Sequence, residues 1–294
     1  MNNFYGLPTL QLENRHLRLE FLATAGPRLV RLFFADSNQN LLAEAPDLTW
    51  HPPYGTYYIR GGHRLWHAPE AWPRTYHPDN NGLAVEEFAG GVRLIQPVEP
   101  ATGICKQIDV QLQADSPVLT IQHYLRNEGS WPVELAPWAI TQTPLGGVAV
   151  LPQPLPESEE SFAPNRSIAL WSYASLDDSR LHLHDDFILV YGQARDHPLK
   201  VGYLNPRGWI GYLYNGVFFC KRFTPQIESQ HPDRNCNTEC YCKDRFVELE
   251  TLAPLTCLEP GQTASHTEIW EFYPSGSVEP TRQGIREFID SLGL

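Results

Sequence analysis

The sequence predicts an all-β fold, a large antiparallel β-sandwich with one short C-terminal helix. Short runs of alternating apolar and polar residues recur along the chain, separated by turn clusters. Proline supplies 26 of the 294 residues, and this disfavours long helices because each proline fixes φ and removes a backbone donor. No repeat with a period of about 20 to 50 residues is visible, so propellers and solenoids are disfavoured.

The predicted strands are short and bounded by glycine, proline, asparagine or aspartate. They span 16–23, 29–34, 92–95, 105–112, 118–125, 133–140, 187–192, 208–214, 217–222, 246–251 and 264–272. Within 105–112, Lys106, Ile108, Val110 and Leu112 share one face of a half-buried strand. Asn215-Gly216 predicts a tight hairpin turn, because this dipeptide tolerates positive φ. These features favour sheets packed face to face.

The end of the chain predicts the one helix, at about 281–292. Its apolar residues Ile285, Phe288, Ile289 and Leu292 fall at i, i+3, i+4 and i+7, which is one face of a helix covering a sheet. The proline-rich stretch 151–164 is interpreted as a surface excursion, with a boundary between two sheet halves as the alternative. No shift in composition demands two domains, so we expect a single domain over 1–294.

Composition and charge exclude several function classes. A net charge of −12 without a basic stripe makes nucleic acid an unlikely partner. No window approaches the roughly 20 apolar residues of a membrane span, and the first residues lack the pattern of a signal peptide. We therefore expect a cytoplasmic protein with reduced thiols, a monomer or weak dimer. Nucleotide-binding glycine loops and a serine-hydrolase elbow do not occur, so those activities lack their motifs.

The segment 51–80 has the most unusual composition. It holds four of the eleven histidines, with three arginines, two tryptophans and four tyrosines. Such polar groups are poor core material but suit the wall of a concave site, where rings stack on a sugar and polar groups bond its hydroxyls. A surface loop with aromatic anchors is the alternative. The candidate binding residues are Arg64, Trp66, Arg74, Tyr76 and Asn80.

A second polar segment, 233–250, supplies candidate acids. Period-2 geometry places Glu248 and Glu250 on one face of a strand. If that face forms the floor of a cleft, each raises the pKa of the other and one serves as a general base. A solvated sheet face is the alternative. Glu239 is a further candidate for binding, and either Glu248 or Glu250 could face the cleft.

Two patterns raise the question of a metal site. Cys236, Cys240 and Cys242, with His231 upstream, depart from the spacing of structural zinc sites and suit packing equally well. His182 and His184 share one strand face, but surface histidines are the simpler interpretation. We therefore expect no metal and no cofactor.

Two passages carry a family resemblance. The first is GGHRLWHAPE at 61–70 with YHPDN at 76–80. The second runs from ELET at 248–251 through LEPGQ at 258–262 to HTEIW at 266–270. Together they resemble the galactose mutarotase-like superfamily, whose members share a large β-sandwich, or supersandwich, and bind or act on sugars. The first passage resembles an uncharacterised bacterial branch of the superfamily. The second is similar to the end of an aldose 1-epimerase, and the resemblance extends to about residue 273.

The resemblance implies roles for individual residues. In the epimerases a glutamate removes the proton of the anomeric hydroxyl and a histidine protonates the ring oxygen. Carried over, the base is Glu250 and the acid is His63 or His67, with Arg64 holding a hydroxyl and Trp66 stacking on the sugar. Where the family has a second histidine this chain has Trp138, and the candidates to replace that histidine are His77 and His123.

The predicted function is therefore a carbohydrate-active protein. It binds a monosaccharide or sugar derivative and, if an enzyme, catalyses cofactor-free isomerisation at the anomeric carbon. One alternative is a non-catalytic sugar-binding module of the same fold. The other is a metal-dependent β-barrel enzyme that uses His182 and His184. Hydrolysis is disfavoured because neither Glu248 nor Glu250 has a clear partner on an opposing wall.

Overall fold

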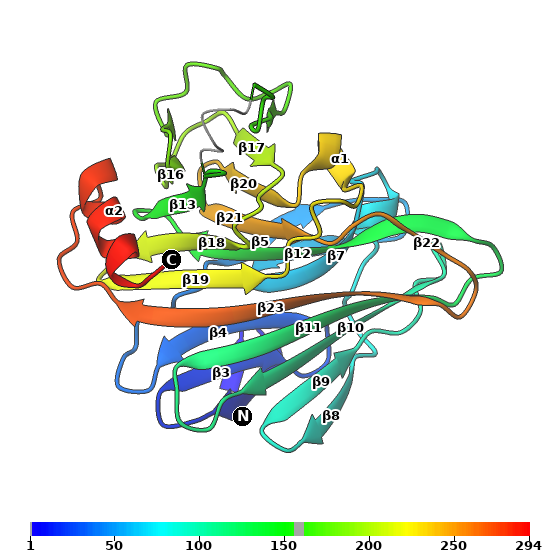
Figure 1. Ribbon diagram of the computed structural model, residues 1–294. Coiled ribbons are helices and arrows are strands. Elements are labelled where there is room, and N and C mark those ends of the chain that lie inside the picture. The colour runs from blue at the N-terminus through cyan, green and yellow to red at the C-terminus, as the bar shows by residue number, and fades with distance from the viewer. Residues whose placement is uncertain (1, 156–161) are drawn as a thin grey trace.

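The computed structural model, which describes residues 2–155 and 162–294, contains two large antiparallel sheets (Figure 1). Among these residues, the first sheet has eleven strands. In spatial order they are β1 (Asn2–Phe4), β2 (Leu7–Glu13), β3 (Leu17–Leu22), β4 (Arg28–Phe34), β7 (His63–Ala68), β12 (Val133–Pro144), β21 (Phe246–Leu252), β20 (Thr238–Cys242), β17 (Leu199–Tyr203) and β14 (Ile168–Leu170), with β22 (Thr256–Leu258) paired to β12.

The second sheet has ten strands within the described ranges. In spatial order they are β15 (Leu181–Leu183), β16 (Phe187–Tyr191), β13 (Val148–Pro152), β18 (Trp209–Tyr214), β19 (Val217–Phe223), β23 (Thr263–Pro274), β11 (Val118–Asn127), β10 (Ile104–Leu112), β9 (Gly91–Ile95) and β8 (Ala84–Phe88). The predicted hairpin at Asn215-Gly216 is confirmed, since Tyr214 of β18 pairs with Val217 of β19.

The main core lies between the two sheets. It is formed by the inward residues of both, such as Leu19 and Leu65 from the first sheet and Ile108 and Ile121 from the second. The predicted alternation of β10 is confirmed, with Ile108 and its same-face neighbours buried between the sheets. Burial of apolar area on both inner faces is what holds the two layers together.

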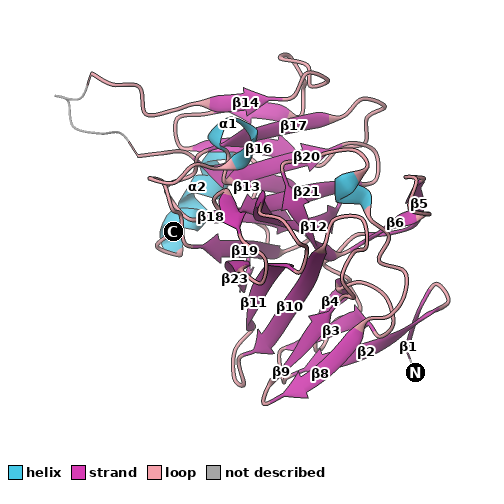
Figure 2. Ribbon diagram, turned by 90° about the vertical axis from the view of Figure 1, so that its right-hand side faces the viewer, coloured by secondary structure: helices cyan, strands magenta, loops and turns pink. Residues whose placement is uncertain are grey.

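Each outer face is partly covered. Helix α2 (Arg282–Ser291) packs Ile285 and Ile289 against the second sheet, which confirms the predicted helix and its apolar face. On the first sheet the cover is a two-stranded hairpin of β5 (Glu44–Trp50) and β6 (Tyr57–Gly61), which lies beside β12 in Figure 2. The 3-10 helix η1 (Arg74–Tyr76) and the short α1 (Pro232–Asn235) complete the elements.

The predicted strands agree with observed ones, with end points differing by a few residues. The segment 151–164 was predicted to lie on the surface, and this is wrong for its first residues. Leu151 and Pro152 are buried and form the end of strand β13. Residues 156–161 of that segment lie outside the described ranges. Within those ranges, the longest helices are too short and too polar to span a membrane.

Candidate functional site

A cavity of about 280 Å³ lies between the outer face of the first sheet and the hairpin β5–β6. Aromatic rings form much of its wall: Trp50, Trp66, Tyr76, Trp138, Tyr173 and Tyr241. Four charged side chains share the lining: Arg64, Glu70, Lys200 and Glu248. A small cavity that combines rings with converging charged groups is typical of a ligand-binding site.

The register of the first sheet explains this convergence. Trp66 of β7 pairs with Trp138 of β12, and Glu248 of β21 pairs with Tyr241 of β20. Lys200 of β17 pairs in turn with Tyr241. Directly opposed residues of neighbouring strands point to the same face, so side chains far apart in the sequence meet on one surface.

Arg64 and Glu248 form an ion pair in the floor of the cavity. The Nη2 of Arg64 lies 2.8 Å from Oε1 of Glu248, and Gln142 donates from Nε2 to the same oxygen at 2.8 Å. The guanidinium also lies over the ring of Trp66, 4.3 Å from its centre. Burial raises the pKa of the Glu248 carboxyl, and the Arg64 charge opposes this shift.

Two nitrogens of Arg64 lack a hydrogen-bond partner among the described residues. They are Nε and Nη1, and both are buried. Native proteins pair the great majority of buried polar atoms, so donors of this kind call for an explanation. An acceptor that enters the cavity would supply the missing bonds.

Lys200 lies beside a second pair of carboxylates. Its Nζ is 2.7 Å from Oε2 of Glu239 and 3.0 Å from Oε2 of Glu250. Burial disfavours the ammonium, but the two carboxylates outweigh burial and raise the pKa of Lys200 well above its ordinary value. Burial raises the pKa of Glu239. Trp138 donates from Nε1 to Glu250 at 2.7 Å, which fixes this carboxylate below the cavity.

The structure brings together some of the residues predicted as a site. Arg64, Trp66, Tyr76 and Glu248 line the cavity. Glu239 and Glu250 are fully buried beneath it, in contact with Lys200. Of the two acids on the predicted face of β21, Glu248 is therefore the one that reaches the cavity.

Other predicted residues lie outside the cavity lining. Arg74 donates to the carbonyl of Pro69 within its own loop. Asn80 accepts a hydrogen bond from Arg60 at 2.7 Å and donates to the carbonyl of Thr56 at 2.7 Å. Both side chains stabilise the loops around the site.

The two histidines predicted as acids lie on the other face of β7. His63 and His67 alternate with Arg64 and Trp66 along the strand, so they point between the sheets while Arg64 and Trp66 line the cavity. His63 contacts His123 of the second sheet, and His67 lies 3.4 Å from a carboxylate oxygen of Glu99. The structure does not bring these imidazoles to the cavity.

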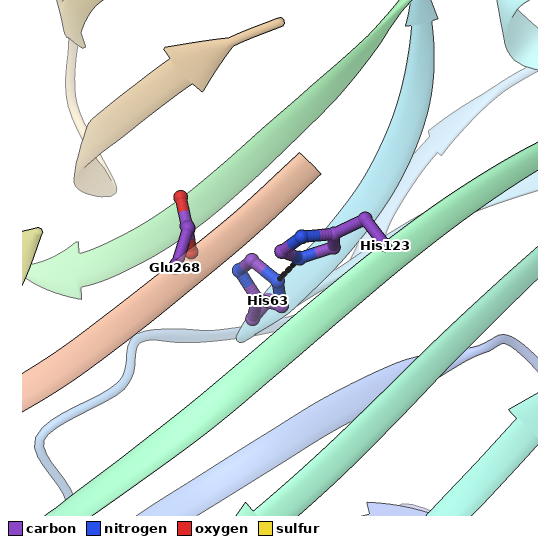
Figure 3. A group of neighbouring side chains, drawn as sticks. All are labelled: His63, His123 and Glu268. Atoms are coloured by element: carbon purple, nitrogen blue, oxygen red, sulfur yellow. Dashed lines mark hydrogen bonds between the residues drawn. The ribbon is translucent and has the colours of Figure 1, made fainter. Parts of the chain in front are cut away.

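His63 belongs to a buried cluster with His123 and Glu268, drawn in Figure 3. One ligand-type atom from each lies within 4.8 Å of the others, the one arrangement of this kind in the described ranges that is suited to a metal ion. Hydrogen bonds account for these atoms. His123 donates from Nδ1 to the carbonyl of His266 at 3.0 Å, and its Nε2 lies 2.7 Å from Nε2 of His63. The Nδ1 of His63 bonds the hydroxyl of Thr141 at 2.9 Å.

The carboxylate of this cluster is also engaged. The ammonium of Lys221 lies 2.9 Å from Glu268, the hydroxyl of Thr251 donates to it at 2.5 Å, and the indole of Trp270 donates at 2.8 Å. A buried ammonium so close to the carboxylate would repel a cation. We therefore interpret the cluster as a polar bridge between the sheets.

The other patterns considered for metal lie elsewhere. His182 is exposed on the edge strand β15 and His184, just after that strand, is half-buried, with ring centres 6.1 Å apart. All six cysteines are free thiols, and Cys236, Cys240 and Cys242 are buried. They form no metal-type cluster in the described ranges.

Several cavity residues were not among the sequence-based candidates. Trp50, Tyr173, Lys200 and Tyr241 all line the cavity. Tyr241 lies within the segment 233–250 but was not singled out there, and the other three come from segments that carry no motif. Lys200 had one visible signal, a single charge within the apolar run 199–203. A lone charge in a buried strand requires a partner, and here the partners are carboxylates of β20 and β21.

Comparison with known proteins identifies the fold. No family model matches the chain, and no curated protein matches its sequence significantly. A galactose mutarotase-like protein from Lactobacillus casei matches with a TM-score of 0.59 at 10% identity, over 90% of this chain and 100% of its own. A candidate aldose 1-epimerase from Klebsiella pneumoniae matches with a TM-score of 0.61 at 9% identity, over 100% of this chain and 85% of its own.

This chain has a galactose mutarotase-like fold. A candidate aldose 1-epimerase from Escherichia coli K12 adds to the agreement, with a TM-score of 0.54 at 14% identity over 92% of this chain and 100% of its own. The fold class and the resemblance inferred from the sequence are thereby confirmed. At these identities the likeness concerns the fold, and the chemistry of the cavity has to be argued from its own residues.

Proposed function

We propose that the cavity binds a monosaccharide or sugar derivative. The observation that carries this proposal is Arg64, whose planar cation is buried against Trp66 and has two nitrogens without a partner among the described residues. Sugar hydroxyls are acceptors of the required kind, and the neighbouring rings would cover the apolar faces of a pyranose. A volume of about 280 Å³ is near the lower limit for small-molecule sites, which suits one sugar unit.

Replacing Arg64 tests this proposal. Arg64→Met keeps the apolar stem but removes the donors, so affinity for the best aldose in a panel should fall about tenfold or more. Calorimetry with glucose, galactose, mannose and xylose measures the affinity. The matched control is Arg93→Met, which breaks a comparable 2.8 Å pair with Asp109 on the second sheet and should leave affinity unchanged. Absence of binding by the wild type to every sugar in the panel contradicts the proposal.

A second candidate function is acid/base isomerisation at the anomeric carbon. The observation that favours it is Glu248, which lines the cavity, has a raised pKa and receives both of its described hydrogen bonds at Oε1. Its Oε2 is thus available to take the proton of the anomeric hydroxyl. Glu250 is fully buried under Trp138, so we assign the base to Glu248.

In this mechanism the ring opens when the anomeric hydroxyl loses its proton and the ring oxygen gains one. Lys200, Tyr173 and Tyr241 line the same cavity and carry protons, so the second proton is assigned to this set of groups. The bond between the anomeric carbon and the ring oxygen breaks as the carbonyl forms. Rotation of the carbonyl and reversal of both proton transfers then give the other anomer.

Polarimetry on freshly dissolved aldoses tests this second function. Glu248→Gln should slow the catalysed change by about 10²- to 10⁴-fold because the base is lost, while sugar affinity stays close to that of the wild type. Glu250→Gln on the same strand is the matched control, with a smaller expected effect. A larger loss in Glu250→Gln would transfer the role to Glu250. If the wild type does not exceed the rate in buffer, the isomerase proposal is contradicted. The protein would then be a sugar-binding module without this activity.

A further inference from the structure

The aromatic wall of the cavity continues outward to the protein surface. Trp66 contacts Tyr76 with ring centres 5.1 Å apart, and Tyr76 contacts Trp72 at 5.4 Å and Trp50 at 6.0 Å. The exposed fraction rises along this row from 5% at Trp66 to 45% at Trp50 and 59% at Trp72. The row therefore begins inside the cavity and ends on two tryptophans that face solvent.

The loop that carries Trp72 is held in place by hydrogen bonds. The backbone N–H of Ala71 donates to the hydroxyl of Thr75, and the N–H of Thr75 returns a bond to the carbonyl of Ala71, both at 2.9 Å. Thr75 itself is fully buried. An ordered loop that leaves most of an indole in water keeps a large apolar area exposed, which is typical of a binding surface.

Polar groups beside these rings indicate what covers them. Glu70 is exposed, lines the cavity and accepts a hydrogen bond from the hydroxyl of Tyr76. A carboxylate next to exposed rings would lose its hydration without compensation under an apolar partner. A sugar supplies both a ring face for the indole and hydroxyl donors for the carboxylate.

The charge of the site points to a neutral ligand. Carboxylates outnumber cations in and directly beneath the cavity, the acids being Glu70, Glu239, Glu248 and Glu250 and the cations Arg64 and Lys200. Each cation is already paired with at least one acid. A phosphate or carboxylate on the ligand would meet this excess of negative charge.

We propose that Trp50 and Trp72 form a second sugar subsite, so that the ligand is a neutral disaccharide or longer glycan whose terminal unit occupies the cavity. This inference rests on the proposed sugar binding. The terminal unit meets Arg64 and Trp66, and the next unit stacks on Trp72 at the mouth. Stacking on exposed indoles adds affinity without a change in the cavity itself.

Calorimetry with matched sugars tests the second subsite. The probes are glucose and galactose with the disaccharides maltose, cellobiose and lactose. We expect at least one disaccharide to bind the wild type about tenfold more tightly than either monosaccharide. Trp72→Ala should remove most of this advantage and leave monosaccharide affinity within about twofold, because Trp72 lies beyond the cavity lining.

A control and the contrary outcomes separate this inference from the proposed function. Trp131→Ala removes another exposed indole, 80% accessible and located before β12, and should change neither affinity. Equal affinity of the wild type for monosaccharides and all three disaccharides would overturn the second subsite and leave sugar binding intact. Equal losses of both affinities in Trp72→Ala would also overturn it, by placing Trp72 in the primary site. Absence of binding to every probe would overturn both proposals.

Discussion

Lys200 sets the electrostatics of the cavity floor. Its ammonium is nearly buried and lies against Glu239 and Glu250, with the rings of Trp138 and Trp171 each 4.6 Å away. Removing three charges from water is costly, and short contacts together with cation–π attraction offset that cost. Burial also raises the pKa of Glu239, so this carboxylate binds a proton more readily than one in water.

Residues of β7 serve two different environments. Arg64 and Trp66 line the cavity, whereas His63 and His67 join hydrogen-bond networks between the sheets. Burial lowers the pKa of both histidines, so they are neutral near pH 7. Neutral imidazoles suit an interior that could not solvate a cation, and proton transfer to a ligand is left to groups in the cavity.

At the scale of the element, Gly62 decides how β7 reaches the sheet. It lies between β6 and β7 at φ +71°, and a Cβ there would lie 1.9 Å from the carbonyl oxygen of Leu29 in β4. Its own N–H donates to the carbonyl of Ala43 at 2.9 Å. The absence of a side chain therefore lets three backbone segments meet behind Arg64.

Gly62→Ala should destabilise the protein strongly. The substitution adds a collision with backbone to the usual strain of positive φ, so we expect a loss of roughly 3 kcal/mol or more in the free energy of unfolding, measured by urea denaturation. Gly261→Ala is the matched control. Gly261 has φ +85° with open space around its Cβ, and strain alone should cost about 1–2 kcal/mol. Equal losses for the two variants would contradict the role given to Gly62.

Strands with clear alternation or turn signals could be predicted from the sequence. The hairpin at Asn215-Gly216 and the alternation around Ile108 are local patterns, so one segment contains the whole signal. Other strands carry weaker signals. β7, β17 and β20 are largely buried on both faces and show mixed polar and apolar residues, because their polar side chains find partners on other strands, as Arg64 does with Glu248 and Lys200 with Glu239.

The candidate site could be predicted only in part for the same reason. Period-2 geometry was sufficient to place Glu248 and Glu250 on one face, and composition marked the segment of Arg64 and Trp66. Lys200 was missed because its partners lie on neighbouring strands, and strand order is a long-range property. The sequence did not predict that His63 and His67 point away from the cavity. The resemblance implied roles for these residues but not which face of their strand they occupy.

At the scale of the whole molecule, buried polar networks cross the core and join the two sheets. His63 of the first sheet bonds His123 of the second, and Thr251 of the first bonds both His266 and Glu268 of the second. In the neutral state His123 accepts a hydrogen bond at Nε2 from His63, since its Nδ1 already donates to a carbonyl. The donors and acceptors are then matched across the interface, which favours one register of the sheets over others.

Acid should therefore destabilise the protein before the carboxylates with ordinary pKa values titrate. Burial lowers the pKa of His63 and His123, and of His266 to about 3, whereas in the unfolded chain each titrates near about 6.5. Between these values the unfolded state binds more protons, so stability is greatest above about pH 6.5 and falls as the pH drops.

Each such histidine raises the unfolding equilibrium constant up to about tenfold per pH unit. Urea denaturation between pH 5 and about 7.5 measures this slope. The raised pKa values of the buried Glu239 and Glu248 act in the opposite direction, so the contribution of one histidine is taken from the difference between variants. His266→Gln should make the slope shallower by about one proton, and replacement of the exposed His51 serves as the control. A slope unchanged in His266→Gln would show that this imidazole is not held neutral by the fold.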